Sequence, residues 1–211
     1  MFSVNANLFR IAATFISKEE TRYYLQGVQI ERHPVRGAVL VATDGHRAFA
    51  AHDEEAILTP EFPEHGVIVK LDTTALKACK ADRRETSDRR LIANSSDTSQ
   101  PLVISNGAPV ALALDWRIDG SFPDWRRIVP NPSFDPSASV AFNTAYLDTF
   151  GKAAKELGHS DPFVAVTGPN DGPLLVTFND NRAFGVIMPV RWKGETSTPL
   201  WLHETPAQAA E

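Results

Sequence analysis

The chain has 211 residues, of which 43% are hydrophobic and 22% charged. It is therefore long enough for one large or two small domains with a buried core, and wholesale disorder is excluded. A net charge of −5 argues against a protein that simply coats nucleic acid, and the single cysteine, Cys79, excludes a disulfide framework or a cysteine-rich zinc site. No apolar run approaches the roughly 20 residues of a membrane span, and the N-terminus is a poor signal peptide. We expect a cytoplasmic protein without a membrane partner.

Three segments share one pattern: a short β-prone run, then Asn or Asp, then a helix-like apolar pattern. They read FSVNANLFRIAATF, VIVKLDTTALKACK and SVAFNTAYLDTFGKAAKEL. Asn5, Asp72 and Asn143 are helix N-cap types, because their side-chain oxygen can accept a free backbone N–H of the first turn. The spacings from 5 to 72 and from 72 to 143, which are 67 and 71 residues, suit a unit of one helix and several strands.

Most of the runs after each helix-like segment are alternating or apolar and are bounded by Gly, Pro, Asn and Asp, which is typical of antiparallel strands and hairpins. FNDNRAF, for example, predicts a hairpin turn. We therefore predict an α+β fold of repeated β-α-β-β-β half-domains, with antiparallel sheets backed by helices. The predicted parts are a complete domain at 1–120 (half-domains 1–58 and 66–120), a proline-rich connector at 121–136, a third half-domain at 137–192 and a flexible tail at 193–211.

An odd number of half-domains leaves one without a partner. A single unit of about 60 residues has a thin core, so the third unit is expected to pair with a copy of itself through an isologous contact.

The formal charges of the helix-like segments are +1 for 7–22, +3 for 73–90 and 0 for 146–159. Ordinary solvated helix faces explain these values; a mildly basic face that tolerates a phosphate backbone is the alternative.

The stretch TDGHR places Asp44, His46 and Arg47 together after an apolar run. A catalytic or metal-binding cluster would need further ligands or a nucleophile, and no GxSxG, Walker or paired-cysteine motif is present. The remaining histidines show no metal-ligand spacing; they are His33, His52, His65, His159 and His203. The preferred interpretation is a strand end and a tight turn, so we predict a non-enzyme with no catalytic residue, no metal site and no cofactor.

Five separated motifs occur in order: TRYYLQGV, LVATDGHRAFA, GSFPDWRRIVP, VAFNTAYL and FGVIMPVRW. Together they resemble the bacterial DNA polymerase III β sliding clamp family, and the resemblance implies the DNA-clamp fold. It covers most of residues 15–192 and corresponds to the middle domain followed by the last half of the C-terminal domain. The family has six half-domain repeats per chain, and this sequence contains three.

In that family, the turn at TDGHR forms one wall of a groove that captures short peptides of polymerases and other clients. An apolar slot for leucine and aromatic anchors, with a few orienting polar groups, suits this use. The alternative for VIMPV is a core strand with an edge proline. By matched motif, the resemblance implies a groove of Leu25, Thr43, Gly45, His46, Arg47, Pro123, Arg127, Ile128, Asn143, Tyr146, Val186, Ile187, Met188, Pro189, Val190 and Arg191.

The resemblance also implies DNA contacts. Tyr23 and Tyr24 match a pair that reaches DNA from a loop in the family, with ordinary sheet aromatics as the alternative. Glu19 stands where the family usually has Gln, and its carboxylate would repel DNA. The helix cations expected to face a duplex are Arg10, Lys77, Lys80 and Lys152.

The resemblance implies a shortened sliding-clamp homologue, a DNA polymerase processivity factor that encircles or contacts duplex DNA and docks client peptides. Its expected partners are double-stranded DNA in weak, sequence-independent contact, DNA polymerase and other clamp-binding peptides, a clamp loader, and further copies of the chain as a homo-oligomer. The alternative is a clamp-fold interaction protein that binds client peptides without encircling DNA. Ring closure, the identity of the clients and the role of the tail stay open.

Overall fold

The computed structural model describes residues 2–80, 88–93, 101–112, 116–130, 140–158, 164–169 and 172–190. Arg191 and the predicted tail 193–211 therefore lie outside the described residues. The strands are β1 Phe2–Asn5, β2 Val28–Arg32, β3 Ala38–Thr43, β4 Arg47–Asp53, β5 Ile57–Leu58, β6 Val67–Val69, β7 Arg90–Ala93, β8 Leu102–Ser105, β9 Ala108–Leu112, β10 Arg117–Ile118, β11 Val164–Thr167, β12 Leu174–Phe178 and β13 Ala183–Ile187. The helices are α1 Ala6–Ala12, α2 Thr73–Ala78 and α3 Thr144–Glu156, with 3-10 helices η1 Ala13–Phe15, η2 Glu20–Leu25 and η3 Trp125–Ile128.

The three predicted N-caps are confirmed. The Asn5 side chain accepts the Leu8 N–H at 3.0 Å, and Asp72 accepts from the N–H groups of Thr74 and Ala75. Asn143 accepts the Ala145 N–H at 3.0 Å. Each cap satisfies a backbone donor that the first helical turn leaves free. The α-helices therefore start where the repeated pattern places them.

The first unit (β1, α1 and β2 to β5) and the second unit (β6, α2 and β7 to β10) exchange their first strands. β1 joins the second unit's strands in a five-stranded sheet of order β5-β1-β7-β8-β9, and β6 pairs with β2 of the first unit. Each unit thus gives its first strand to the sheet of the other unit, so the two units are related by an approximate two-fold axis. Neither unit keeps all of its strands in one sheet, which explains why two repeats are needed for one core.

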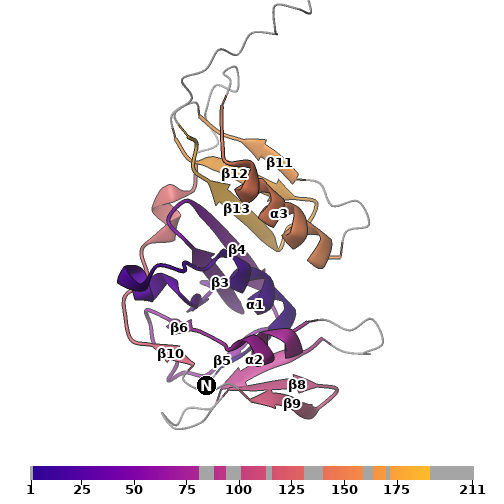
Figure 1. Cartoon of the computed structure of the whole chain (residues 1–211). Coiled ribbons are helices and arrows are strands. Elements are labelled where there is room, and N and C mark those ends of the chain that lie inside the picture. Colours follow the sequence, from indigo (N-terminus) through magenta and orange to yellow (C-terminus); the bar gives the residue numbers. More distant parts are fainter. Residues whose placement is uncertain are drawn as a thin grey trace, which may run out of the picture.

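The third unit (residues 140–142, α3 and β11 to β13) joins the sheet of the first unit at one edge, but among the described residues it exchanges no strand with either unit. β13 pairs antiparallel with β4 over five residues, from Ala183 opposite Ala51 to Ile187 opposite Arg47. This pairing produces an eight-stranded sheet of order β10-β6-β2-β3-β4-β13-β12-β11 that includes strands of all three units. Helix α3 also packs beside α1, and Figure 1 shows α3, α1 and α2 on the same side of the molecule.

The eight-stranded sheet is apolar on both faces. Towards the helices, the buried Phe49 and Phe178 belong to the main core with Phe15 and Phe150. On the opposite face, Val39, Val41 and Ala50 form a second cluster, which Phe122, Trp125 and Phe184 cover. Phe122 and Trp125 belong to the predicted connector, so this segment closes the outer face of the sheet.

The predicted connector contains a 3-10 helix at Trp125–Ile128, and Asp124 caps it by accepting the Arg126 N–H at 3.3 Å. The β-prone run before α3 differs from its expected strand. Residues 140–142 form no strand with another described residue, although the Val190 N–H donates to the Ala141 carbonyl at 2.8 Å. The FNDNRAF hairpin is confirmed as the β12–β13 turn. Among the described residues, no helix is long and apolar enough to cross a membrane.

Candidate functional site

A cavity of about 200 Å³ lies where the first unit, the connector and the third unit meet. Its floor is the seam between β4 and β13, which the hydrogen bond from the Met188 N–H to the His46 carbonyl, at 2.8 Å, extends past the strand ends. The lining residues are Leu25, Thr43, Gly45, His46, Arg47, Pro123, Asp124, Trp125, Ile128, Val186 and Met188. Most are apolar, and the polar side chains come from the β3–β4 turn (Thr43, His46 and Arg47) and from the start of η3 (Asp124), which is the usual character of a ligand-binding site.

The TDGHR stretch is a turn between β3 and β4, as predicted. The Asp44 carboxylate accepts the N–H groups of His46 and Arg47 at 2.9 and 3.0 Å. The Thr43 hydroxyl accepts the Gly45 N–H at 3.1 Å and donates to the Arg47 carbonyl. Gly45 has φ of 89°, a left-handed conformation that glycine adopts without strain. Asp44 is thus engaged by the backbone of its own turn.

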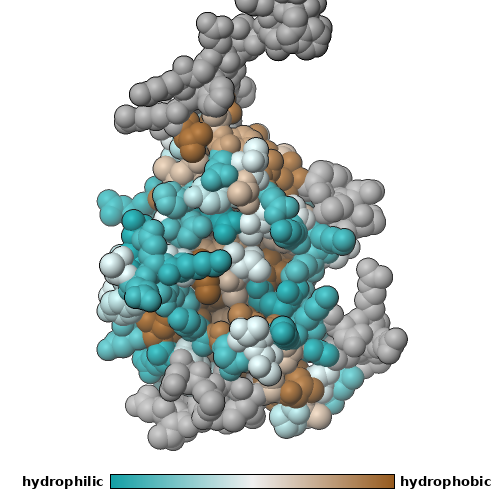
Figure 2. Space-filling model, viewed as in Figure 1, coloured by the Kyte–Doolittle hydropathy of each residue, from teal (hydrophilic) through white to brown (hydrophobic). Residues whose placement is uncertain are grey.

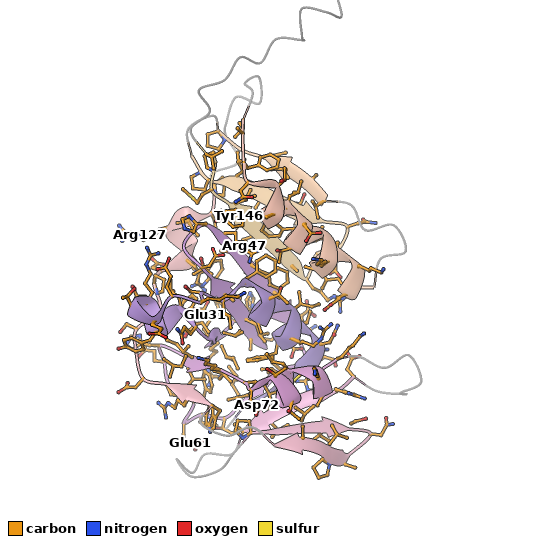
Figure 3. All side chains as sticks on the ribbon, in the orientation of Figure 1. Glu31, Arg47, Glu61, Asp72, Arg127 and Tyr146 are labelled. Carbon is orange, nitrogen blue, oxygen red and sulfur yellow. The ribbon has the colours of Figure 1, made fainter. Side chains whose placement is uncertain are left out.

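Arg47 connects this turn to the third unit. Its Nε donates to Asp44 Oδ2 at 3.0 Å, and Nη1 donates to the Thr149 hydroxyl of α3. The guanidinium carbon lies 5.2 Å from the centre of the Phe15 ring and 5.3 Å from that of Tyr146, within the range of a cation–π contact. Figure 3 shows Arg47 and Tyr146 side by side. Arg47 therefore helps to hold the two units that form the cavity.

The connector forms the opposite wall. The Trp125 ring lies 5.9 Å from the Phe184 ring, and the Arg126 guanidinium stacks 4.4 Å over Trp125. Glu31 accepts from Trp125 Nε1 at 3.3 Å and pairs with Arg126. These contacts anchor η3 on the sheet, so Ile128 and Trp125 are held towards β13.

The structure brings together most, but not all, of the residues that the resemblance assigned to a groove. Tyr146 borders the cavity, because its ring lies 5.9 Å from that of His46 and nearly parallel to it. Ile187 is fully buried and supports the floor from the core side. Arg127 is exposed at the outer edge of η3, away from Arg47 and Tyr146 (Figure 3). The other assigned residues that do not line the cavity are Asn143, Pro189 and Val190.

Two lining residues, Asp124 and Trp125, were missed by sequence reasoning. Both stand inside the GSFPDWRRIVP motif, between Pro123 and the arginines. A short run with prolines on both sides and Asp before Trp is a sequence signal of a capped turn. That signal could have placed Trp125 on the apolar side of η3.

The residues assigned to DNA contact do not form one surface. Arg10 is paired with Glu156 of α3 and only 17% exposed, and Lys152 pairs with Asp148 at 2.6 Å. Lys77 and Lys80 are exposed at the end of α2. Tyr23, which is 52% exposed, and Tyr24 belong to η2; in Figure 1, this indigo 3-10 helix lies at the left edge, whereas α1 to α3 lie on the right.

Ionisable groups at the site do not suggest a metal centre. Among the residues that the structure describes, no group of three or more His, Cys, Asp or Glu side chains could hold a metal ion. Cys79 lies in the core, where burial raises its pKa to about 12. A thiol with so high a pKa is a poor nucleophile at neutral pH. What the site can do, on this geometry, is bind an apolar side chain.

Comparison with known proteins gives a consistent result. No protein-family model matches the chain. The beta sliding clamps of two strains of Caulobacter vibrioides are 34% identical over 125 residues, which is 54% of this chain and 29% of theirs. The chain thus spans less than a third of the length of these curated relatives.

Solved structures of sliding clamps are similar over nearly the whole chain. The clamp of Pseudomonas aeruginosa with a ligand has a TM-score of 0.63 at 16% identity, covering 90% of this chain and 65% of that one. The Bartonella birtlesii clamp bound to griselimycin has a TM-score of 0.61 at 20% identity, covering 91% and 66%. The Caulobacter crescentus clamp has a TM-score of 0.58 at 22% identity, covering 90% and 65%. The chain therefore has the sliding-clamp fold and is similar to part of a bacterial beta sliding clamp.

Proposed function

We propose that this chain is a clamp-like processivity factor that docks short peptides of client proteins in the cavity at the β4–β13 seam. The observation that carries the proposal is that the cavity unites residues from four of the five separated motifs. Leu25, His46, Ile128 and Met188 are one example from each. An apolar anchor of the peptide would lie between β13 and the connector. Its backbone would meet the polar end formed by Thr43 and the TDGHR turn.

The size of the site supports a short linear segment rather than a folded surface. About 200 Å³ accommodates one or two side chains, so leucine and aromatic anchors suit it better than a large ligand. The thioether of Met188 adapts to anchors of different shape. From the likeness to sliding clamps, we propose DNA polymerase and other replication proteins as the partners and the cytoplasm as the location.

A peptide-binding assay tests this proposal. The probes are fluorescently labelled short peptides that carry leucine and phenylalanine. The variant Met188→Ala keeps the backbone hydrogen bond to His46 but removes the side chain from the wall, and we expect the Kd to rise about 5- to 30-fold, or 1–2 kcal/mol. Val110→Ala, an exposed valine of β9, is the matched control. Unsaturable binding, or equal Kd values for wild type and Met188→Ala, would refute the proposed site.

For DNA, we propose weak, sequence-independent contact at the helix side, carried by Lys77 and Lys80. The pairing of Arg10 and Lys152 with carboxylates lowers the positive charge there and favours the second candidate function, a peptide-binding protein that does not encircle DNA. Lys77→Ala/Lys80→Ala should weaken duplex binding at low salt and reduce its salt dependence, whereas Arg127→Ala, on the opposite side, should not. Equal effects of both changes would contradict helix-side contact.

A further inference from the structure

The third unit keeps open a sheet edge that the other two units cover for each other. In the first unit, β1 precedes the helix and pairs with β7, the strand that follows the helix of the second unit. In the second unit, β6 precedes the helix and pairs with β2, the strand that follows the helix of the first unit. In the third unit, β11 follows the helix and pairs only with β12 among the described residues. Residues 140–142 precede the helix and contact Val190 on one side, just as β1 contacts β5 and β6 contacts β10. Both halves of the exchange are present, and each has one edge that pairs with no strand among the described residues.

Burial agrees with this comparison. Val4, Val28 and Leu91 lie at the exchanged pairs of the first two units and are at most 1% exposed. Phe142, which corresponds to Val4 by its place before the cap, is only partly buried. Val164 and Val166, which face inward from β11, are also only partly buried. Figure 2 shows hydrophobic residues at the upper end of the described body, where Figure 1 places the third unit.

We propose that two copies of the chain associate through their third units about a two-fold axis, with β11 of each copy pairing antiparallel with residues 140–142 of the other. A second copy is the matching occupant, because the third unit offers both the strand to be received and the edge that receives it. Such self-complementarity is what an isologous interface requires. The two third units together then form one complete domain of the kind that the first and second units form.

The register follows from the pairing already present in the chain. Val4 lies opposite Leu91, and Ser3 lies opposite Ile92. With the β1–β7 pairing as the template, Phe142 takes the place of Val4, and we assign Val164, the first inward-facing residue of β11, to the place of Leu91. Ala141 then lies opposite Ala165, on the outer face. Cross-strand Cβ atoms in such pairs are about 4.5–5.5 Å apart.

The solution mass gives the first test. Light scattering of the wild type should give twice the chain mass of 23.2 kDa. Val166→Lys places an ammonium group in the proposed core but leaves it accessible in a single copy, so the mass should fall by half. Val110→Lys puts the same charge on β9, the edge of the other sheet, and should not change the mass. A wild-type mass of one chain, or the same mass for both lysine variants, overturns the proposal.

A crosslinking test does not depend on weakening the fold. In Ala141→Cys/Ala165→Cys, the first position is partly exposed and the second exposed, and the native Cys79 is buried. Mild oxidation should give a covalent dimer on a non-reducing gel, because the Cα atoms of directly opposed residues in an antiparallel pair are about 4.5–5.5 Å apart, within the range that a disulfide spans. Each single-cysteine variant should stay at the monomer position on the gel. In the proposed dimer, the two copies of any one position lie in different sheets, so their cysteines cannot reach each other. Equal crosslinking of the single and double variants contradicts the proposed register and overturns the proposal.

Discussion

The contact of Phe150 with Gly185 predicts a coupling between α3 and β13 that can be measured. The Phe150 ring is fully buried, lies 4.9 Å from the Phe15 ring and 6.3 Å from the Phe178 ring, and covers Gly185. A Cβ at Gly185 would lie 2.9 Å from two carbons of that ring, although Gly185 is not among the glycines with positive φ. Close approach, rather than backbone conformation, therefore requires glycine at this position.

Phe150→Ala should cost about 3–5 kcal/mol of unfolding free energy, because it leaves a cavity in a close-packed core. Gly185→Ala should cost about 1–3 kcal/mol by overpacking against the ring. In the double variant, the added methyl occupies space that the ring has left. The combined loss should therefore be about 1–3 kcal/mol smaller than the sum of the two single losses.

Urea unfolding measures the change in unfolding free energy for each single variant and for the double variant. With a slope of about 2 kcal/mol/M, Phe150→Ala should lower the midpoint by roughly 2 M. Gly151→Ala is the control on the same helix: no atom lies within 4 Å of the added Cβ, so it should stabilise the protein by about 0.5–1 kcal/mol. Additive losses in the double variant would show that the ring and Gly185 are not in contact and that α3 does not dock on β13 through Phe150.

Three further predictions concern single side chains. Arg47→Ala should lower the unfolding free energy by about 3 kcal/mol, because it leaves the largely buried Asp44 carboxylate without its cation; Arg47→Lys, tested by the same urea titration, should recover part of the loss. Asn143→Ala should cost about 1 kcal/mol through loss of the α3 cap, whereas Asn143→Asp should cost little; a smaller loss for Ala than for Asp in thermal unfolding would contradict the cap. Burial raises the pKa of Cys79 from 9.0 to about 12, so above pH 9 the unfolded chain releases this proton before the folded one, and stability falls. Between pH 8 and 10, the wild type should lose about 1.4 kcal/mol more than Cys79→Ala, and parallel pH profiles would contradict the assignment.

Local features of the fold were predictable because they depend on neighbouring residues. Each cap precedes its helix directly, and the TDGHR turn is determined by Asp44 and Gly45 within four residues. Strands after each helix were recognised from alternation and from their Gly and Pro boundaries. In these segments, propensity and tertiary structure favour the same conformation.

The seam between β4 and β13 was not predictable from pattern alone. It joins residues 47–51 to 183–187, and both strands are apolar enough to pair with several others. Strand pairing at such separation depends on the whole sheet rather than on local preference. The resemblance to clamps brought the groove residues together, but it could not show that Ile187 faces the core or that the Arg10 charge is neutralised by Glu156.

The remaining sheet edges indicate how far association through third units can extend. β9 is the counterpart of β4 in the second unit and is an edge strand in the described structure. Unlike β4, it contains a proline, Pro109, and its pairing with β8 is irregular between Val103 and Ile104. Pro109 offers no N–H to an added strand, and proline at an edge disfavours further pairing. Association through third units would then end at two copies, with the β9 edge of each copy left without a further strand.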